Sequence, residues 1–354
     1  MKIRIRGTIA ALAVTLALMG LLTACSQQES GPGSTSPGVL TLNSAGSTLA
    51  YPIYSKWFAE YHDSHSNVQI NYASIGSGGG IQQLRSGTVD FGASDMPLND
   101  KLLGTFKSKI VQFATVLGAV VPIYNIPGVK ADLRFTPQVL AGIYLGKIRK
   151  WDDPAITRAN PGIHFPNKDI VPVYRSDGSG TTFVWTDFLS KVSPEWKTKV
   201  GSNTSVSWPA GLGGKGSEGV TGVVEQTPYA FGYVELIYAI QNHMGYGLVQ
   251  NSEGKFIKAS LDNVTLAAQS AAKELARDIR VSITNAPGPD AYPISTFTYL
   301  LIPARIDNAT RRETIKDFLH WMLTDGQKDA EPLSYSPLPQ QVVDIELKQI
   351  QEIH

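Results

Sequence analysis

Three stretches rich in glycine, serine and threonine each stand where an apolar, strand-like run gives way to a helix-like run. No other feature of the sequence constrains the fold as much. The stretches are residues 45–48, 76–80 and 175–182. From Val39 onward, short apolar runs alternate with stretches that have apolar residues at helical spacing. This alternation is typical of α/β proteins, in which helices cover the faces of a sheet. The three stretches therefore predict three strand-to-helix turns of one kind.

A turn of this composition can hold a small anion. The first N–H groups of a helix have no partner within the helix, and the helix dipole places partial positive charge there. Glycine lets an anion approach these groups closely, and serine or threonine adds a hydroxyl donor. One such turn alone is ordinary helix capping, and Thr48 is a candidate N-cap with Pro52 in the opening turn. Three of them, one with Arg175 ahead of its glycines, favour a small oxyanion.

An acidic residue, Asp95, follows a further strand-like run at 89–91 and a turn of small residues. A carboxylate beside an anion is unfavourable unless the ligand carries a proton to donate, as HPO4²⁻ and H2PO4⁻ do. Sulfate has no such proton at neutral pH, and a buried polar mismatch of this kind can cost about 10⁴-fold in binding. The alternative is that Asp95 only caps the next segment, 97–103. The spacing alone leaves both interpretations open.

The first 24 residues have the pattern of a secretory signal, with a basic start, an apolar stretch and small residues at the end. The junction with Cys25 matches the bacterial lipoprotein pattern, in which the cysteine is lipidated and becomes the new N-terminus. A plain signal or a single membrane anchor is the alternative. Residues 25–38 are polar and rich in glycine, proline and serine, which predicts a flexible tether spanning about 20 Å. We therefore expect a protein secreted across the cytoplasmic membrane, lipid-anchored, and facing the periplasm or the cell exterior.

Composition excludes several classes of function. Removing the three cations of residues 1–24 from a formal charge of +1 leaves −2 for the rest of the chain. A chain that binds nucleic acid usually has a basic surplus, so we expect no nucleic-acid partner. Cys25 is the only cysteine, so the remainder offers no thiol nucleophile and no cysteine-ligated metal site. The six histidines form no H-E-x-x-H motif, and we expect neither a metal nor another cofactor.

Several segments imitate catalytic motifs without matching them. Residues 211–219 resemble a nucleotide-binding P-loop but do not match it. Pro209 stands at the position of the leading glycine of the motif, and Gly216 follows Lys215 where the motif has Ser or Thr. The segment therefore predicts a surface loop. Ser77 and Ser179 do not stand in the G-x-S-x-G pattern of hydrolases. The paired carboxylates at 152–153 precede a proline and indicate a turn or helix start, not an acid–base pair. Because no nucleophile–base pair is evident, we expect no enzymatic activity.

Longer segments of the sequence resemble a known family. They are AGSTLAYPIYSKW, IGSGGGIQQLRSGTVDFGASDMPL, IYLGKIRKWDDPAI, RSDGSGTTFVWTDFL and GLGGKGSEGV. These segments are similar to those of the PstS family, the periplasmic phosphate-binding proteins of the bacterial high-affinity phosphate ABC transporter. The similarity runs in order from about Leu40 to about Leu338. It implies an α/β, type II periplasmic-binding-protein fold, in which two lobes of mixed sheets flanked by helices are joined by two crossover hinge strands.

The resemblance also implies which residues hold the phosphate. By motif they are the hydroxyl and backbone of Thr48, the backbone of Leu49, Ser77, Asp95, Arg175, Ser179, Gly180 and Thr181. Asp95 matches the residue that accepts the ligand's proton, and Asp177 matches one that pairs with the arginine and moderates its charge. Two positions depart from the family pattern. Leu49 stands where many relatives have phenylalanine, and Gly78 stands where some have a second serine.

Strand-like segments at 119–125 and 292–303 are candidates for the two hinge strands. They would divide the chain into a first lobe, residues 39–121 plus 295–354, and a second lobe, residues 122–294. Phosphate contacts would then come from both lobes, and binding would close them. Two C-terminal stretches with helical spacing, which begin at Thr310 and Gln341, are expected to pack on the first lobe.

The resemblance implies a monomeric, lipid-anchored receptor that binds inorganic phosphate and delivers it to a membrane permease driven by an ATPase. Two alternatives remain from the residues themselves. One is a receptor for another tetrahedral oxyanion, against which Asp95 argues when the oxyanion is fully deprotonated. The other is a secreted phosphate-ester hydrolase, against which the lack of a nucleophile–base pair argues.

Overall fold

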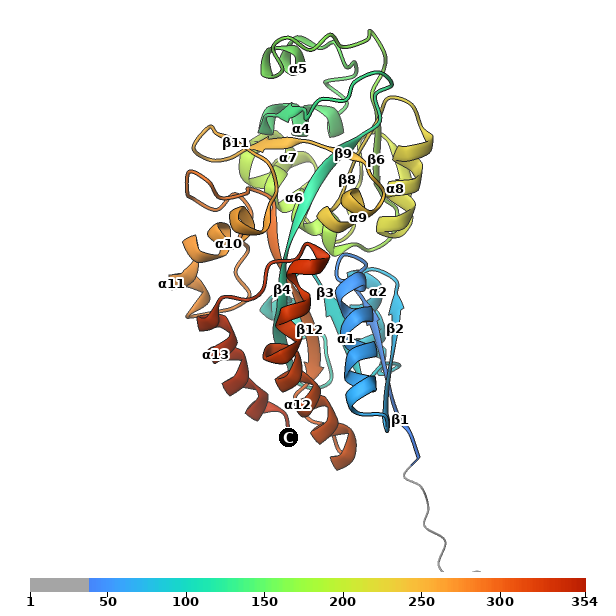
Figure 1. Cartoon of the computed structure of the whole chain (residues 1–354), viewed down its shortest axis with the longest axis vertical. Helices are drawn as coiled ribbons and strands as arrows, with labels where there is room; N and C mark the ends of the chain where they lie inside the picture. The colour runs from blue at the N-terminus through green and yellow to red at the C-terminus, as the bar shows by residue number, and fades with distance from the viewer. Residues whose placement is uncertain (1–37) are drawn as a thin grey trace, which may run out of the picture. The chain divides into compact units, whose positions relative to one another are not determined.

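A mixed nine-stranded sheet organises the structure, a computed structural model that describes residues 38–354 (Figure 1). The strand order is β2-β1-β3-β12-β4-β8-β6-β7, and β9 pairs with β4 beside this path. A second, three-stranded sheet has the order β11-β10-β5. The strands are β1 Leu40–Gly46, β2 Val68–Ser74, β3 Phe91–Ser94, β4 Ile110–Tyr124, β5 Arg134–Phe135, β6 Val171–Arg175, β7 Leu212–Gly214, β8 Ala230–Glu235, β9 Gly245–Tyr246, β10 Leu248–Gln250, β11 Phe256–Ile257 and β12 Ser295–Pro303.

The predicted signal, Cys25 and all of the predicted tether except Gly38 lie outside the described residues. Val39–His354 group into one unit by their contacts. Within residues 38–354, no helix has both the length and the apolar character that a membrane span requires.

The long strand β4 connects two parts of the large sheet. Ile110–Ala119 pair antiparallel with β12, whereas Val120–Tyr124 pair antiparallel with β8. We term β2, β1, β3, β12 and residues 110–119 of β4 the first sheet half. The remainder of β4 with β8, β9, β6 and β7 is the second sheet half. The predicted strand at 119–125 is thus the end of a longer strand, and the one predicted at 292–303 is β12.

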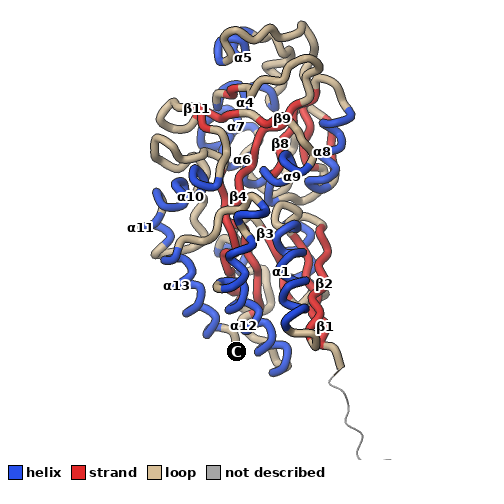
Figure 2. Tube along the Cα trace, viewed as in Figure 1, coloured by secondary structure: helices blue, strands red, loops and turns tan. Residues whose placement is uncertain are grey.

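Helices pack around both sheet halves (Figure 2). In the first half, α1 packs on β2 and α2 packs on β1 and β3, while in the second half α8 packs on β6, β7 and β8. Both predicted C-terminal helices are confirmed as α12 and α13, and α13 contacts β4. The helices are α1 Tyr51–Ser64, α2 Ser77–Ser86, α3 Asp100–Leu103, α4 Pro137–Tyr144, α5 Pro154–Ala159, α6 Gly180–Val192, α7 Pro194–Lys199, α8 Gly216–Gln226, α9 Leu236–Gln241, α10 Leu261–Ser270, α11 Ala272–Leu275, α12 Ala309–Leu323 and α13 Gln340–Gln349, with short 3-10 turns η1 Asp325–Asp329, η2 Glu331–Leu333 and η3 Ile350–Glu352.

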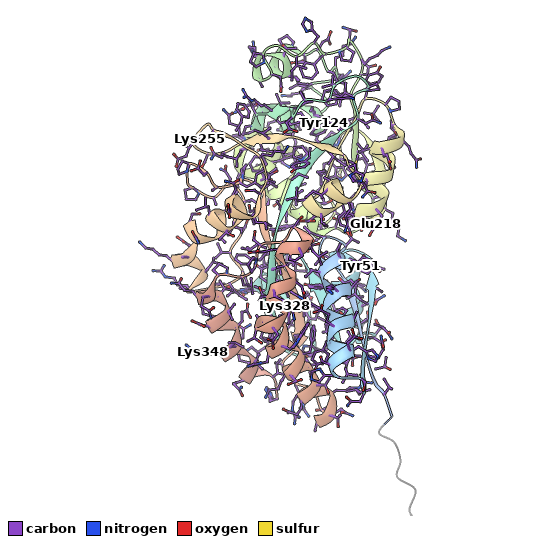
Figure 3. The ribbon with its side chains drawn as sticks, viewed as in Figure 1. Tyr51, Tyr124, Glu218, Lys255, Lys328 and Lys348 are labelled. Carbon is purple, nitrogen blue, oxygen red and sulfur yellow. The ribbon has the colours of Figure 1, made fainter. Side chains whose placement is uncertain are left out.

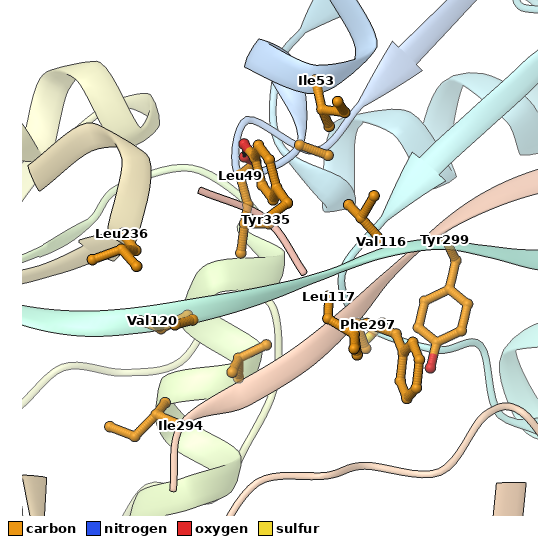
Figure 4. Packing of buried hydrophobic residues seen from close by; sticks show 14 of the residues in the cluster. Leu49, Ile53, Val116, Leu117, Val120, Leu236, Ile294, Phe297, Tyr299 and Tyr335 are labelled. Atoms are coloured by element: carbon orange, nitrogen blue, oxygen red, sulfur yellow. Dashed lines mark hydrogen bonds between the residues drawn. The ribbon is translucent and has the colours of Figure 1, made fainter. Parts of the chain in front are cut away.

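Apolar side chains fill the region where β4 passes from one half to the other (Figure 4). Val120 of β4 lies there with Leu49, Leu236 and Ile294, and all four are buried. Burial of apolar surface contributes about 25 cal/mol per Å² to the stability of the folded state. This buried cluster therefore helps to hold both sheet halves on β4. The side chain of Leu49 belongs to this core, which leaves only its backbone for a binding role. Leucine in place of the family's phenylalanine therefore keeps the apolar character that the position needs.

Candidate anion-binding site

Four helices begin at the junction between the two sheet halves. They are α1, α2, α6 and α8, and the turns before them follow the carboxyl ends of β1, β2, β6 and β7. Ligands of open α/β sheets bind beyond the carboxyl ends of parallel strands, and helix N-termini attract anions. Three of the four turns are those predicted from the sequence. The fourth lies before α8, within residues 211–219, where a surface loop was predicted. Residues 211–213, 215 and 218 are exposed as predicted, but the segment forms β7 and the start of α8 in place of a loop, and Gly214, Gly216 and Ser217 are buried.

Close backbone contacts join the turns of the two halves. The N–H of Gly78 donates to the carbonyl of Gly178 at 2.8 Å, and a Cβ at Gly78 would lie 3.0 Å from the Cα of Gly178. Gly180 is packed more tightly still, because a Cβ there would lie 2.3 Å from both Asp95 Oδ2 and Ser77 Oγ. Glycine at position 180 therefore brings the start of α6 directly against polar groups of the first half.

At the starts of α1, α2 and α6, five buried backbone N–H groups have no hydrogen-bond partner among residues 38–354. Three come from the first half and two from the second: Thr48, Leu49, Ser77, Gly180 and Thr181. Buried N–H groups without a partner are rare, because each costs the free energy of a lost hydrogen bond. Five at one junction indicate a site for an acceptor with several oxygen atoms.

The turn before α1 differs from its prediction in one respect. Helix α1 begins two residues later than expected, with Ala50 as the N-cap residue and Pro52 in the first turn. The predicted capping by Thr48 is wrong, because the N–H of Ala50 donates to Ser47 Oγ at 3.1 Å instead. Thr48 Oγ1 lies 2.9 Å from the hydroxyl oxygen of Ser217 on α8. Its hydroxyl thus faces the second half of the sheet.

Two tyrosines hold the carbonyl groups of the same turn. The hydroxyl of Tyr335 donates to the carbonyl of Leu49 at 2.6 Å, and that of Tyr238 donates to the carbonyl of Thr48 at 2.6 Å. Because the C=O and N–H of one peptide point in opposite directions, Tyr238 keeps the N–H of Leu49 directed away from itself. Tyr238 belongs to α9 of the second half, so this bond also crosses the junction.

A surface groove lies beside this tyrosine. It is lined by Tyr51 and Pro52 of α1 and by Glu218, Thr221 and Tyr238 of the second half. Figure 3 shows Tyr51 and Glu218 near each other where the two halves meet. Because Tyr238 both lines the groove and bonds to the turn before α1, it forms the boundary between the groove and the anion-binding site.

Arg175 ends β6, and its side chain is 1% exposed. Its Nε donates to Asp177 Oδ1 at 2.8 Å and its Nη2 donates to Asp177 Oδ2, a paired geometry that fixes the plane of the guanidinium. Its Nη1 lies 3.4 Å from the hydroxyl oxygens of Thr181 and Ser217, so the Nη1 protons remain available for a stronger acceptor. Burial raises the pKa of Asp177, but the hydrogen bond and charge of Arg175 outweigh this and hold that pKa below its usual value.

Asp95 follows β3 and is 1% exposed. Its Oδ1 accepts hydrogen bonds from the hydroxyls of Ser47 and Thr298, the latter at 2.9 Å. Burial raises the pKa of Asp95 above its usual value, although both hydroxyls and the charge of Arg175 oppose the shift. The structure thus places a buried carboxylate directly beside the unpaired N–H groups.

The alternative role of Asp95 as a helix cap is contradicted. Asn99 caps α3, because its Oδ1 accepts the N–H of Leu102 at 2.9 Å. The helix start predicted at the paired carboxylates is confirmed, since Asp153 caps α5 by accepting the N–H of Ala155 at 2.8 Å.

Ser179 is the N-cap of α6, and its Oγ accepts the N–H of Thr182 at 3.1 Å. Because that bond uses a lone pair, the hydroxyl proton remains available. All the predicted binding residues are buried at the junction, and Asp177 is paired with Arg175. Sequence reasoning missed Ser217, Thr298 and Tyr238. Only Ser217 had a signal, the glycine-rich composition that it shares with the other three turns.

Comparison with known proteins identifies the family. A family model described as a PBP superfamily domain matches residues 31–326. The phosphate-binding protein PstS of Xylella fastidiosa (strain Temecula1) is 46% identical over 303 residues, which cover 85% of this chain and 82% of that protein. The chain belongs to the PstS family. The PstS family consists of binding proteins that serve transport and is not an enzyme family. Because this chain belongs to the family, the expectation of an exported protein is confirmed.

Solved structures share the fold. A high-affinity periplasmic phosphate-binding protein, PfluDING, determined with bound phosphate at pH 8.5, matches with a TM-score of 0.69 at 20% identity, over 86% of this chain and 92% of that one. An ABC-type phosphate transport receptor from Vibrio cholerae matches with a TM-score of 0.55 at 17% identity, over 84% and 100%. At these identities the likeness shows the fold alone. It confirms the predicted two-lobe periplasmic-binding-protein fold of the PstS family.

Proposed function

We propose that this PstS family member binds one inorganic phosphate ion between the two sheet halves and delivers it to the permease of a phosphate ABC transporter for import. The observation that carries the proposal is the set of five buried N–H groups without partners, drawn from both halves and placed beside Arg175 and Asp95. Such a number of donors suits an anion with several oxygens. A carboxylate among the donors suits an anion that still carries a proton.

Each residue of the site then has a defined role. Asp95 accepts the proton of the bound phosphate, and Asp177 holds the guanidinium of Arg175 in place while it balances part of the charge. The phosphate oxygens accept hydrogen bonds from the N–H groups of Thr48, Leu49, Ser77, Gly180 and Thr181, from the hydroxyls of Thr48, Ser77, Ser179 and Thr181, and from Arg175.

Energetics favour tight binding without an excess of positive charge. Hydrogen bonds to a charged group contribute roughly 1.5–3 kcal/mol each, so a handful exceeds the ~8 kcal/mol of a micromolar complex after the losses to ordering and desolvation. Because Arg175 is paired with Asp177, the attraction comes mainly from peptide and hydroxyl dipoles at short range. The site is buried, which also limits screening by salt.

We further propose that residues 39–121 plus 295–354 and residues 122–294 move as two lobes about β4 and β12. Two hydrogen bonds join the proposed lobes in this structure. The N–H of Gly78 donates to the carbonyl of Gly178, and the hydroxyl of Tyr238 donates to the carbonyl of Thr48. These contacts require the lobes to be close together. Phosphate that touches both lobes stabilises the same closed arrangement, so binding drives closure.

Delivery of phosphate requires the receptor to stay near its permease. We propose that residues 1–24 are removed as a signal, that Cys25 carries the lipid, and that residues 25–38 act as the tether. The protein then works as a monomer, with no cofactor and no catalytic step, at a permease driven by its ATPase.

Calorimetry on protein freed of endogenous phosphate tests this function. We expect micromolar or tighter binding of phosphate, binding of sulfate weaker by about 10³-fold or more, and no turnover of a chromogenic phosphate ester. Failure to bind phosphate would overturn the proposal. Equal affinity for sulfate would indicate a general oxyanion receptor, and ester hydrolysis that survives repurification would indicate a hydrolase.

A further inference from the structure

The two carboxylate oxygens of Asp95 have different surroundings. Oδ1 accepts two hydroxyl hydrogen bonds, from Ser47 and from Thr298 on β12. Within residues 38–354, the only hydrogen-bond donor to Oδ2 is the Ser77 hydroxyl, at 3.4 Å, and Oδ2 faces Gly180 of the other sheet half. Oδ1 is therefore held in place by hydroxyls of the first half, whereas Oδ2 is directed at the junction where phosphate is proposed to bind.

The directions of the hydrogen bonds behind Asp95 follow from the chemistry of the groups. The Thr115 hydroxyl must donate to the carbonyl of Thr298, at 3.2 Å, because a carbonyl can only accept. The hydroxyl of Tyr54, 3.0 Å from Thr115 Oγ1, must then donate to Thr115, and burial raises the pKa of Tyr54 so that it keeps its proton. The Thr298 hydroxyl donates to Asp95 Oδ1, because an oxygen of an ionised carboxylate can only accept. With two donors at Oδ1, no proton can be placed on that oxygen.

A β-bulge puts Thr298 in this position. Along the β4–β12 pair, Thr298 is opposite Val116 and Tyr299 is opposite Ala114, so Thr115 is an extra residue on β4. A bulge re-aims side chains and leaves backbone groups unpaired. Both groups here are paired by C-terminal side chains, since Glu346 Oε1 accepts the N–H of Ala114 at 2.7 Å and Gln327 Nε2 donates to the carbonyl of Thr115 at 2.9 Å.

We propose that Thr298, together with Ser47, determines specificity by positioning Asp95: the two hydroxyls keep the carboxylate ionised with Oδ2 directed at the ligand, so that the site accepts only a tetrahedral oxyanion with an O–H group. This inference rests on the proposed function and refines it. Thr298 itself does not touch the phosphate. It acts through Asp95, from a strand that contributes no other residue to the site.

Sulfate provides a probe of the protonation state of Asp95, because sulfate itself does not titrate near neutral pH. A protonated Asp95 can donate from Oδ2 to sulfate, whereas the ionised form repels it. The Thr298 hydroxyl opposes the effect of burial on the pKa of Asp95, so its removal raises the pH at which Asp95 takes up a proton. The other charged or titratable groups around Asp95 are Arg175, Glu235, Tyr54, Tyr72 and Tyr335.

The test is calorimetry of the full chain with phosphate and with sulfate from about pH 5 to about pH 8. In Thr298→Val we expect phosphate to bind at most about tenfold more weakly, because Asp95 loses one of its two hydroxyl donors but stays in the site. Sulfate affinity should rise as the pH falls, beginning at a higher pH than in the wild type. Thr298→Ser should restore wild-type behaviour. Thr296→Val, on the same strand with its hydroxyl bonded to the carbonyl of Phe297 at 2.8 Å, should leave both ligands unaffected.

The outcomes separate this inference from the proposed function. A wild type that does not bind phosphate would overturn the function itself. A wild type that binds phosphate and rejects sulfate, with a folded Thr298→Val that has the same affinity ratio and pH profile, would overturn only the role of Thr298. If Thr298→Val does not fold, Ser47→Ala removes the other donor to Oδ1. The same shift in sulfate binding would then support the inference, and an unchanged profile would contradict it.

Discussion

The two sheet halves contribute opposite charges to the site and control them in different ways. In the second half, Arg175 is paired with a carboxylate, Asp177, so its charge is largely balanced. In the first half, Asp95 is held by the neutral hydroxyls of Ser47 and Thr298, so its charge is retained. If phosphate binds as proposed, affinity and selectivity arise in different places. Dipoles and the remaining guanidinium protons then attract the anion, and the unbalanced carboxylate decides which anion is accepted.

The halves also differ in how their site residues are supported. The second half gathers its main groups within one short loop, from Arg175 to Thr181, and the Asp177 carboxylate also accepts the N–H of Gly216 at 3.0 Å. The first half depends on distant parts of the chain, because Thr298 and the bulge behind Asp95 belong to the C-terminal third.

The largest expected effect comes from a change that keeps the halves apart. In Gly180→Ala, the added methyl group would overlap Asp95 Oδ2 and Ser77 Oγ. We expect phosphate affinity to fall by at least about 10³-fold, because several hydrogen bonds of roughly 1.5–3 kcal/mol are lost together. Gly222→Ala is the matched control, since a Cβ at Gly222 meets open space. Calorimetry on both variants measures the effect, and near-wild-type affinity of Gly180→Ala would show that the halves do not close as described.

A smaller effect on phosphate affinity is expected when the guanidinium of the second half is removed. Arg175→Ala removes the guanidinium and leaves Asp177 without its partner, so phosphate affinity should fall roughly a hundredfold while the protein stays folded. Arg175→Lys keeps the charge but not the paired geometry, and it should recover only part of the loss. Titration calorimetry combined with circular dichroism measures both quantities. A folded Arg175→Ala with unchanged affinity would contradict the role of this half.

Removing the carboxylate of the first half should change the selectivity for phosphate over sulfate more than the affinity for phosphate. Asp95→Asn replaces the charged acceptor with an amide that can also donate, so phosphate affinity should fall by about tenfold while sulfate affinity rises. The ratio of the two dissociation constants is therefore the quantity to measure. A variant that loses affinity for both anions equally would place selectivity elsewhere.

Ionic strength should have the smallest effect. Because Arg175 is balanced by Asp177 and the site is buried, an increase from about 0.05 M to about 0.5 M NaCl should change phosphate affinity by less than roughly threefold. A steep decline in affinity over this range would mean that long-range attraction by net positive charge dominates.

The same contrast explains what the sequence could predict. The turns that hold Thr48, Ser77 and Arg175 were predictable because each joins a strand to a helix within a few residues of distinctive composition. The turn before α8 was misjudged, because β7 is only three residues long and contains two glycines, so it has no apolar periodicity. Capping by Thr48 was also misjudged, since Ser47 accepts the N–H of Ala50.

The supporting groups of the first half could not be predicted locally. Thr298 is 203 residues from Asp95 in sequence, and Tyr238 is 190 residues from Thr48. Their contacts arise from the crossing of β4 and β12 and from a bulge that no hydrophobic pattern reveals. Such contacts form only when the sheet is assembled. The binding residues from Arg175 to Thr181, by contrast, are close together in the sequence itself.

A crystal structure of the phosphate complex tests the central claim most directly. We expect one phosphate whose oxygens lie within hydrogen-bond distance of the N–H groups of Thr48, Leu49, Ser77, Gly180 and Thr181, with one oxygen bonded to Asp95 Oδ2 and another to Arg175. An anion bound elsewhere, or one turned so that no oxygen reaches Asp95, would contradict it.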